Sequence, residues 1–102
     1  MNPLHYPEFT QSSLDEIALT AMGEELDDQV LRPSISIKGT VGAIAAQAKQ
    51  ARIMTASAAL DLLRHGEAMA AQISYVLADV RCIDTFLRDS AGHFQLIRMR
   101  LV

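Results

Sequence analysis

Residues 60–88, LDLLRHGEAMAAQISYVLADVRCIDTFLR, decide the fold, because a glycine separates two runs rich in helix-forming residues. Gly66 follows Arg64 and His65, which suit the negative C-terminal end of a helix. One helix over residues 40–88 would be roughly 70 Å long at ~1.5 Å per residue, whereas a compact domain of this length has a radius of gyration of about 13 Å. We therefore expect an antiparallel helical hairpin that turns at Gly66. A continuous helix within an oligomer is the alternative.

Both arms of the expected hairpin carry apolar residues at helical spacing. The second helix of the chain is expected to begin at a Thr40 cap, and its apolar face continues to Leu62. The third helix is expected from Glu67 to about Arg88. The hairpin places Arg52 one turn from Asp84. These two side chains are expected to pair, because a partly buried charge left alone is destabilising.

The remaining segments surround this hairpin. Residues 1–11, with two prolines, are expected to form a flexible N-terminal segment, and residues 12–102 a single helical domain. Ser13 and Glu16 match a capping box, which predicts a first helix ending near Leu26. Residues 34–38 alternate as a short strand or a linker, and the tail from Ile97 is a strand or a last helical turn. The expected fold class is all-α. It is a three-helix arrangement built on the hairpin, and the two alternating segments could pair as a short terminal β-ribbon.

Composition excludes several classes of protein. The 102 residues suit one domain, and the formal net charge of -3 argues against direct nucleic-acid binding, which needs a basic surface. The single cysteine, Cys82, cannot form an internal disulfide and fits a cytoplasmic location. We expect no signal peptide, because the N-terminus has neither a basic nor an apolar targeting region. We expect no membrane span either, since no uncharged apolar run reaches about 18 residues.

The sequence predicts no catalytic, cofactor-binding or metal-binding residues. His5, His65 and His93 have no second ligand at a metal-binding spacing, and Cys82 has no histidine three or four residues away. The segment IKGTVGA has two glycines at the wrong spacing for a phosphate-binding loop. We therefore expect that the protein is not an enzyme and uses no cofactor.

A second apolar stripe on the expected third helix is the main functional signal. Its residues recur every three or four positions, on the side opposite the main apolar face. Either the first helix covers this stripe in a closed three-helix bundle, or the stripe binds a second copy or another protein. The candidate partner-binding residues are Tyr75, Ala78, Cys82 and Phe86, with Ile53 and Leu60 as a weaker counterpart on the second helix.

Residues 41–87, VGAIAAQAKQARIMTASAALDLLRHGEAMAAQISYVLADVRCIDTFL, resemble a group of short helical pseudomonad proteins, the QslA-like quorum-sensing anti-activators. The resemblance covers about half of the chain and rests on composition and pattern, without a signature motif. It implies a cytoplasmic, dimeric, helical protein that binds the ligand-binding domain of a LuxR-type transcription factor and blocks dimerisation of that factor. It assigns no functional residues to this chain.

Two functional hypotheses follow from the spare apolar surface. The first is a regulatory protein-binding module that sequesters a partner protein, such as a transcription factor, and that itself forms a homodimer. The second is a self-associating structural or assembly subunit of a secretion system or a phage. Both use the same surface, so the sequence does not separate them.

Overall fold

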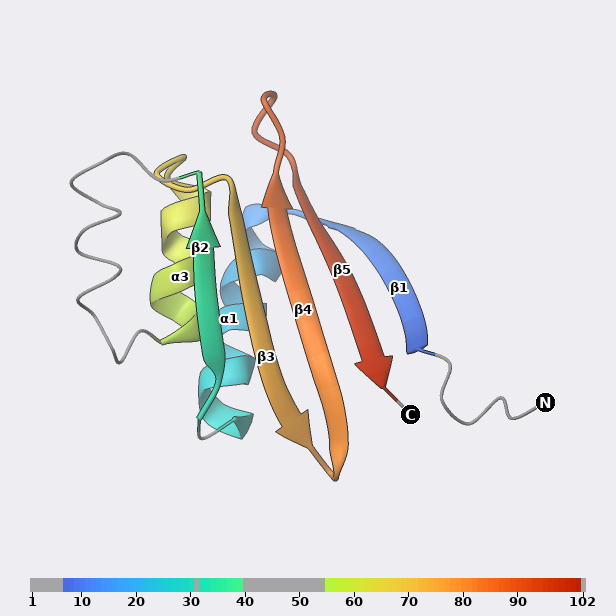
Figure 1. The fold of residues 1–102 in the computed structure, drawn as a ribbon. Coiled ribbons are helices and arrows are strands. Elements are labelled where there is room, and N and C mark those ends of the chain that lie inside the picture. Colours follow the sequence, from blue (N-terminus) through green and yellow to red (C-terminus); the bar gives the residue numbers. More distant parts are fainter. Residues whose placement is uncertain (1–6, 31, 40–54, 102) are drawn as a thin grey trace.

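The computed structural model describes residues 7–30, 32–39 and 55–101, and shows an antiparallel sheet with helices on one face. The sheet has five strands in the order β1-β5-β4-β3-β2. Helices α1 (Glu16–Gln29) and α3 (Ala56–Arg64) lie behind the part of the sheet formed by β2, β3 and β4 (Figure 1). The expected all-α fold is therefore wrong.

The chain begins its described part with a strand. Residues 7–11, which we expected to be flexible, belong to β1 (Pro7–Leu14), which pairs with the C-terminal strand. Helix α1 starts two residues later than a capping box at Ser13 would place it. Its cap is Asp15, whose carboxylate accepts a hydrogen bond from the backbone nitrogen of Ala18 at 2.7 Å.

The alternating segment β2 (Ser34–Lys38) is a strand at one edge of the sheet. It pairs with β3 (Ala70–Leu77) and not with the C-terminal tail, so the expected terminal β-ribbon is wrong. The expected second helix is partly seen. Its C-terminal part is α3, capped by Thr55, and its Thr40 cap and Ile53 lie outside the residues that the structure describes.

Gly66 does form a turn, with a φ of +73° that favours glycine. The backbone nitrogen of Gly66 donates to the carbonyl of Leu63 at 3.0 Å, and that of Glu67 donates to the carbonyl of Leu62 at 2.8 Å. Nη1 of Arg88 caps the same helix end, because it donates to the carbonyl of Leu63 at 2.9 Å. A strand follows this turn, so the expected helical hairpin is wrong. The expected turn at Gly66 is confirmed.

The expected third helix is a β-hairpin. Strand β3 pairs with β4 (Val80–Arg88), and the chain reverses at Ala78 and Asp79, whose φ values are +50° and +64°. Two consecutive residues with positive φ match the tight turn that best fits the twist of a hairpin. Burial follows a period of two: Ile73 and Tyr75 are buried on β3, and Asp84 and Phe86 on β4. Helical propensity is overridden here by cross-strand packing.

The tail is strand β5 (Phe94–Leu101), which lies between β1 and β4 and pairs with both. The core lies between the sheet and the two helices. It contains Leu19, Leu26, Leu60, Leu63, Ile73, Phe86 and Phe94. The helices approach closely at Gly23, where an added Cβ would lie 3.0 Å from the Cα of Ser57. Neither described helix is long and apolar enough to cross a membrane.

Candidate functional site

The face of the sheet opposite the helices is uncovered by any other described element (Figure 1). Residues directly opposite each other on neighbouring strands point to the same face. One row across this open face is Phe9, Met99, Ile83 and Ser74, from β1, β5, β4 and β3. Its centre is therefore apolar across three adjacent strands.

Neighbouring rows extend this apolar area. On β5, Ile97 and Leu101 lie on either side of Met99 along the same face. Leu101 lies opposite Arg81 of β4. Phe9 and Val76 are each 64% exposed, and Leu101 is 41% exposed. We call the set the open-face patch. It consists of Phe9, Val76, Ile83, Ile97, Met99 and Leu101.

The surroundings of the open-face patch are polar and contain no carboxylate among the strand residues that the structure describes on this face. The amide of Gln11 donates to the side chain of Gln95 at 3.1 Å. The charged residues of this face are Arg81 and Lys38. By contrast, α1 carries five acidic residues in the segment EIALTAMGEELDDQ and no lysine or arginine. Among the described residues, acidic side chains are thus concentrated on the helical side of the sheet.

On the helix side of the sheet, a buried polar cluster joins three strands. Asp84 is 0% exposed, and its Oδ2 accepts a hydrogen bond from the hydroxyl of Tyr75 at 2.8 Å. Nε and Nη2 of Arg98 donate to the two oxygens of Asp84 at 2.8 and 2.9 Å. Burial and the hydrogen bond to Asp84 raise the pKa of Tyr75. The hydrogen bond to Asp84 also raises the pKa of Arg98, against the opposing effect of burial.

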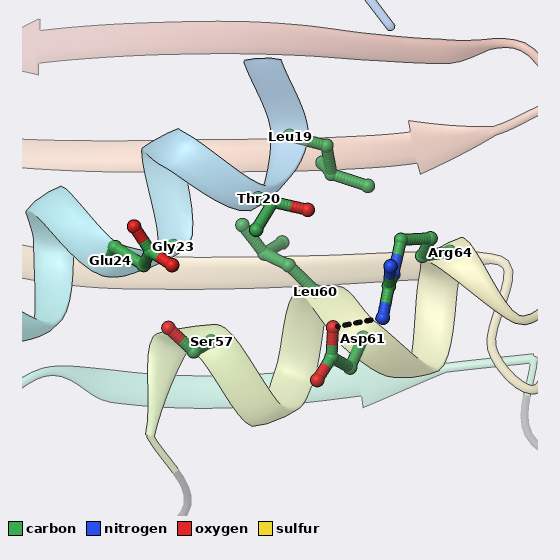
Figure 2. A pocket seen from close by; sticks show the side chains of 8 residues that line it. All are labelled: Leu19, Thr20, Gly23, Glu24, Ser57, Leu60, Asp61 and Arg64. Atoms are coloured by element: carbon green, nitrogen blue, oxygen red, sulfur yellow. Dashed lines mark ion pairs between the residues drawn. The ribbon is translucent and has the colours of Figure 1, made fainter. Parts of the chain in front are cut away.

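A groove of about 190 Å³ lies between the two helices (Figure 2). Helix α1 contributes Thr20 and Glu24 to it, and α3 contributes Asp61 and Arg64. Nη2 of Arg64 lies 3.3 Å from the carboxylate of Asp61, and both side chains are partly exposed. The groove therefore holds a surface ion pair beside a second carboxylate. No hydrogen bond among the described residues joins the hydroxyl of Thr20 or Ser57 to a carboxylate of this groove.

The described side chains show no arrangement typical of catalysis. Cys82 is buried, and its Sγ lies 3.7 Å from the carbonyl of Val80. His93 lies in an exposed loop, where its Nδ1 is 3.3 Å from the carboxylate of Asp89. Backbone hydrogen bonds from His93 and Ala91 lower the pKa of Asp89. In the described ranges, no three His, Cys, Asp or Glu side chains gather as metal ligands.

The structure places the candidate partner-binding residues mainly in the core. Tyr75, Cys82 and Phe86 lie on the helix side of the sheet, with exposures of 6%, 3% and 0%. Leu60 is buried in α3, at 2%. Ala78 is exposed, in the β3–β4 turn. Ile53 lies outside the described residues, as does Arg52 of the expected pair with Asp84. Among the described residues, Tyr75 and Arg98 bind the carboxylate of Asp84.

The open-face patch is the feature that a helical interpretation hides. Its residues come from β1, β3, β4 and β5, and pairing of β1 with β5 brings Phe9 to Met99. The alternation of apolar and basic residues from Ile97 was the available signal, because a period of two predicts a strand with one apolar face. Comparison with protein-family models, with curated proteins and with solved structures gave no match.

Proposed function

We propose that the protein is a small, non-catalytic protein-binding module whose binding surface is the open-face patch. The observation that carries this proposal is the exposure of Phe9, Val76 and Leu101 on a sheet face that no described element covers. Contiguous exposed apolar surface is typical of sites for protein partners, whereas single exposed apolar residues are ordinary. The apolar surface that the sequence predicted on a helix is thus assigned to a sheet.

The chemistry of this face supports a partner that presents an apolar surface flanked by carboxylates. Arg81 lies between Val76 and Leu101 of the patch, and Lys38 lies at the far edge of the same face, without a strand carboxylate between the two cations. Complementary charges at the edge of an apolar contact set the orientation and the association rate. Two copies of this face brought together would oppose cations with cations. We therefore assign the face to a different protein.

Such a module fits the role of a regulator that sequesters its partner. The resemblance to QslA-like anti-activators implies a helical protein, which the five-stranded sheet contradicts. The partner that it implies, a transcription factor of the LuxR type, stays a prediction. A cytoplasmic location and a homodimer also stay predictions. A self-associating assembly subunit is the alternative, and it would place a second copy on the open-face patch.

The test compares partner capture and oligomeric state in matched variants. Phe9→Ser with Val76→Ser removes apolar surface from the patch, and Arg81→Glu reverses its charge. Ile17→Ser is the control, since Ile17 is 81% exposed on α1. A cellular protein that cross-links to the wild type should no longer cross-link to either patch variant. It should still cross-link to the Ile17→Ser control. Its binding should weaken with salt in the wild type.

Two outcomes would overturn the proposal. Capture that survives both patch variants would place the binding surface elsewhere. A molar mass in solution that rises with protein concentration, and that no longer rises in Phe9→Ser with Val76→Ser, would show that a second copy occupies the face. Sizing by light scattering distinguishes these results from a wild-type protein whose oligomeric state does not depend on the open-face patch.

A further inference from the structure

A small pocket lies on the opposite side of the sheet from the open-face patch, beyond the area that the helices cover. Strands β5 and β1 form it, with Arg98 opposite Thr10 and Arg100 opposite Glu8. These four residues line a hollow of about 200 Å³. Glu8, Thr10 and Arg100 are exposed, so the pocket opens to solvent.

The guanidinium of Arg98 is held in a fixed orientation at this pocket. Its Nε and Nη2 form two hydrogen bonds with Asp84, which is fully buried and also accepts from Tyr75. A guanidinium has five N–H groups in a planar fork. The paired edge uses Nε and one N–H of Nη2. The other edge, formed by Nη1 and the second N–H of Nη2, is left for another acceptor.

That second edge is accessible. The side chain of Arg98 is 24% exposed, and Nη1 forms no hydrogen bond with any residue in the described part of the chain. Two parallel N–H groups of one guanidinium match the two oxygens of a carboxylate. A side chain whose orientation is already fixed by its neighbours loses little conformational entropy on binding.

The charges of the pocket select among anions. Arg98 is largely balanced by Asp84, and Arg100 adds a positive charge opposite the carboxylate of Glu8. The formal charges of Glu8, Asp84, Arg98 and Arg100 therefore sum to about zero. We expect a site with so little net positive charge to bind a singly charged ligand in preference to a multiply charged one such as phosphate. The hydroxyl of Thr10 can donate one further hydrogen bond to a carboxylate oxygen.

We propose that the pocket formed by Glu8, Thr10, Arg98 and Arg100 is a binding subsite for the carboxylate group of a small molecule or of a peptide C-terminus. Arg98 binds the carboxylate through its free edge, Thr10 donates to it, and Arg100 adds attraction. Asp84 and Tyr75 are positioning residues, because they orient Arg98 without reaching the ligand. This subsite does not depend on the open-face patch.

Titration of the whole protein by NMR tests the proposal. The probes are propionate, an N-acetylated alanine dipeptide with a free C-terminus, the same dipeptide amidated, and inorganic phosphate. Propionate and the free dipeptide should give saturable shifts at the Arg98 Nε–H and at the backbone amides of Thr10 and Arg100. The dissociation constants are expected to be millimolar, as for other ligands of a few atoms. If only one probe binds, that probe identifies the source of the carboxylate.

Matched variants separate specific binding from general attraction. Arg100→Gln should weaken propionate binding about two- to fivefold, the range expected for one exposed attractive charge. Thr10→Val should weaken it less, and Glu8→Gln should strengthen it. Arg81→Gln, on the opposite face, is the control and should leave binding unchanged. Variants of Arg98 are avoided, because this side chain also stabilises the buried Asp84.

Three results would overturn the proposal. The first is the absence of a saturable shift with both propionate and the free dipeptide. The second is binding that Arg100→Gln and Thr10→Val leave at wild-type strength. The third is phosphate binding as tight as that of propionate, which would show a general anion site. Partner capture by the open-face patch is measured separately, so failure here leaves that proposal unaffected.

Discussion

Asp84 and Arg98 lie directly opposite each other on β4 and β5, and two hydrogen bonds of 2.8 and 2.9 Å join their side chains. The carboxylate is fully buried, whereas the guanidinium reaches the surface. The pair therefore links the core to the pocket on β1 and β5. Because a buried carboxylate without its partner is strongly destabilising, this pair also fixes the register of the two strands.

Replacing Arg98 should destabilise the protein more than replacing another arginine. Arg98→Met leaves the buried charge of Asp84 without its main partner, and the expected loss is roughly 3–5 kcal/mol of unfolding free energy. Arg81→Met, at the surface of the open face, should change stability by about 0.5 kcal/mol or less. Urea denaturation measures both. Equal losses in the two variants would contradict the role of the pair.

An apolar replacement of the whole cluster should recover stability. Tyr75→Phe, Asp84→Leu and Arg98→Met together leave no unpaired polar group of the cluster in the core. Well-packed apolar residues often replace a buried ion pair without loss. The triple variant should therefore unfold at a higher urea concentration than Arg98→Met alone. A triple variant as unstable as the single one would refute this.

The raised pKa of Tyr75 predicts a stability loss at alkaline pH. In the unfolded chain the hydroxyl titrates near 10.0, whereas in the folded protein burial and Asp84 keep it protonated at higher pH. Above the unfolded-state pKa of 10.0, the unfolded state binds fewer protons than the folded state. The unfolding free energy therefore falls as pH rises, by at most about 1.4 kcal/mol per pH unit. Denaturation at pH 9 to 11 should show a steeper decline in the wild type than in Tyr75→Phe. Parallel declines would contradict the prediction.

Asp27 connects the two helices, and its loss should destabilise the protein. Its carboxylate accepts hydrogen bonds from the backbone nitrogens of Ala56 at 2.7 Å and Ser57 at 3.1 Å, at the start of α3. Asp27→Ala should lower the unfolding free energy by about 1–2 kcal/mol, as for other helix caps. Asp28→Ala, at the exposed neighbouring position, is the control. Thermal melts that shift equally for both variants would exclude a capping role for Asp27.

Gly23 allows close packing of α1 on α3. The Cβ of another residue would lie 3.0 Å from the Cα of Ser57, so Gly23→Val should push the helices apart and cost about 1–3 kcal/mol. Valine is a better helix former than glycine, so a gain would be expected if packing did not matter. Ala21→Val, on the exposed side of α1, is the control. Chemical denaturation in which Gly23→Val is at least as stable as wild type would contradict this packing.

Local signals predicted the elements that depend on nearby residues. The helix end at His65 and Gly66 follows from basic residues and a glycine, and α3 does end there. The alternation in Ser34–Lys38 predicted a strand as one of two alternatives, and β2 is that strand. The first helix was found with its start two residues later than expected, since Asp15 caps it in place of Ser13, and it ends at Gln29, three residues after the expected end near Leu26.

Residues 67–88 show why the rest was missed. Ile73, Val76 and Val80 fit the helical spacing, while Ile73 and Tyr75 also fit the period of two. The alanine, leucine and methionine residues of this segment have high helix propensity, so the sequence favoured a helix. In the structure, Ala78 and Asp79 form a tight turn, and the glycine that usually signals such a turn in a sequence is absent from both positions. The second stripe, read as an interface, contributes Tyr75, Cys82 and Phe86 to the core.

The sequence by itself determined the local features of this protein: its net acidic charge, the cap that ends α3 and the alternation of its short strand. Only the tertiary structure decided that β5 lies between β1 and β4, and this pairing creates both the open-face patch and the Arg98 pocket. The physical reason is that strand pairing joins distant segments, so its stability depends on partners that a local pattern does not contain.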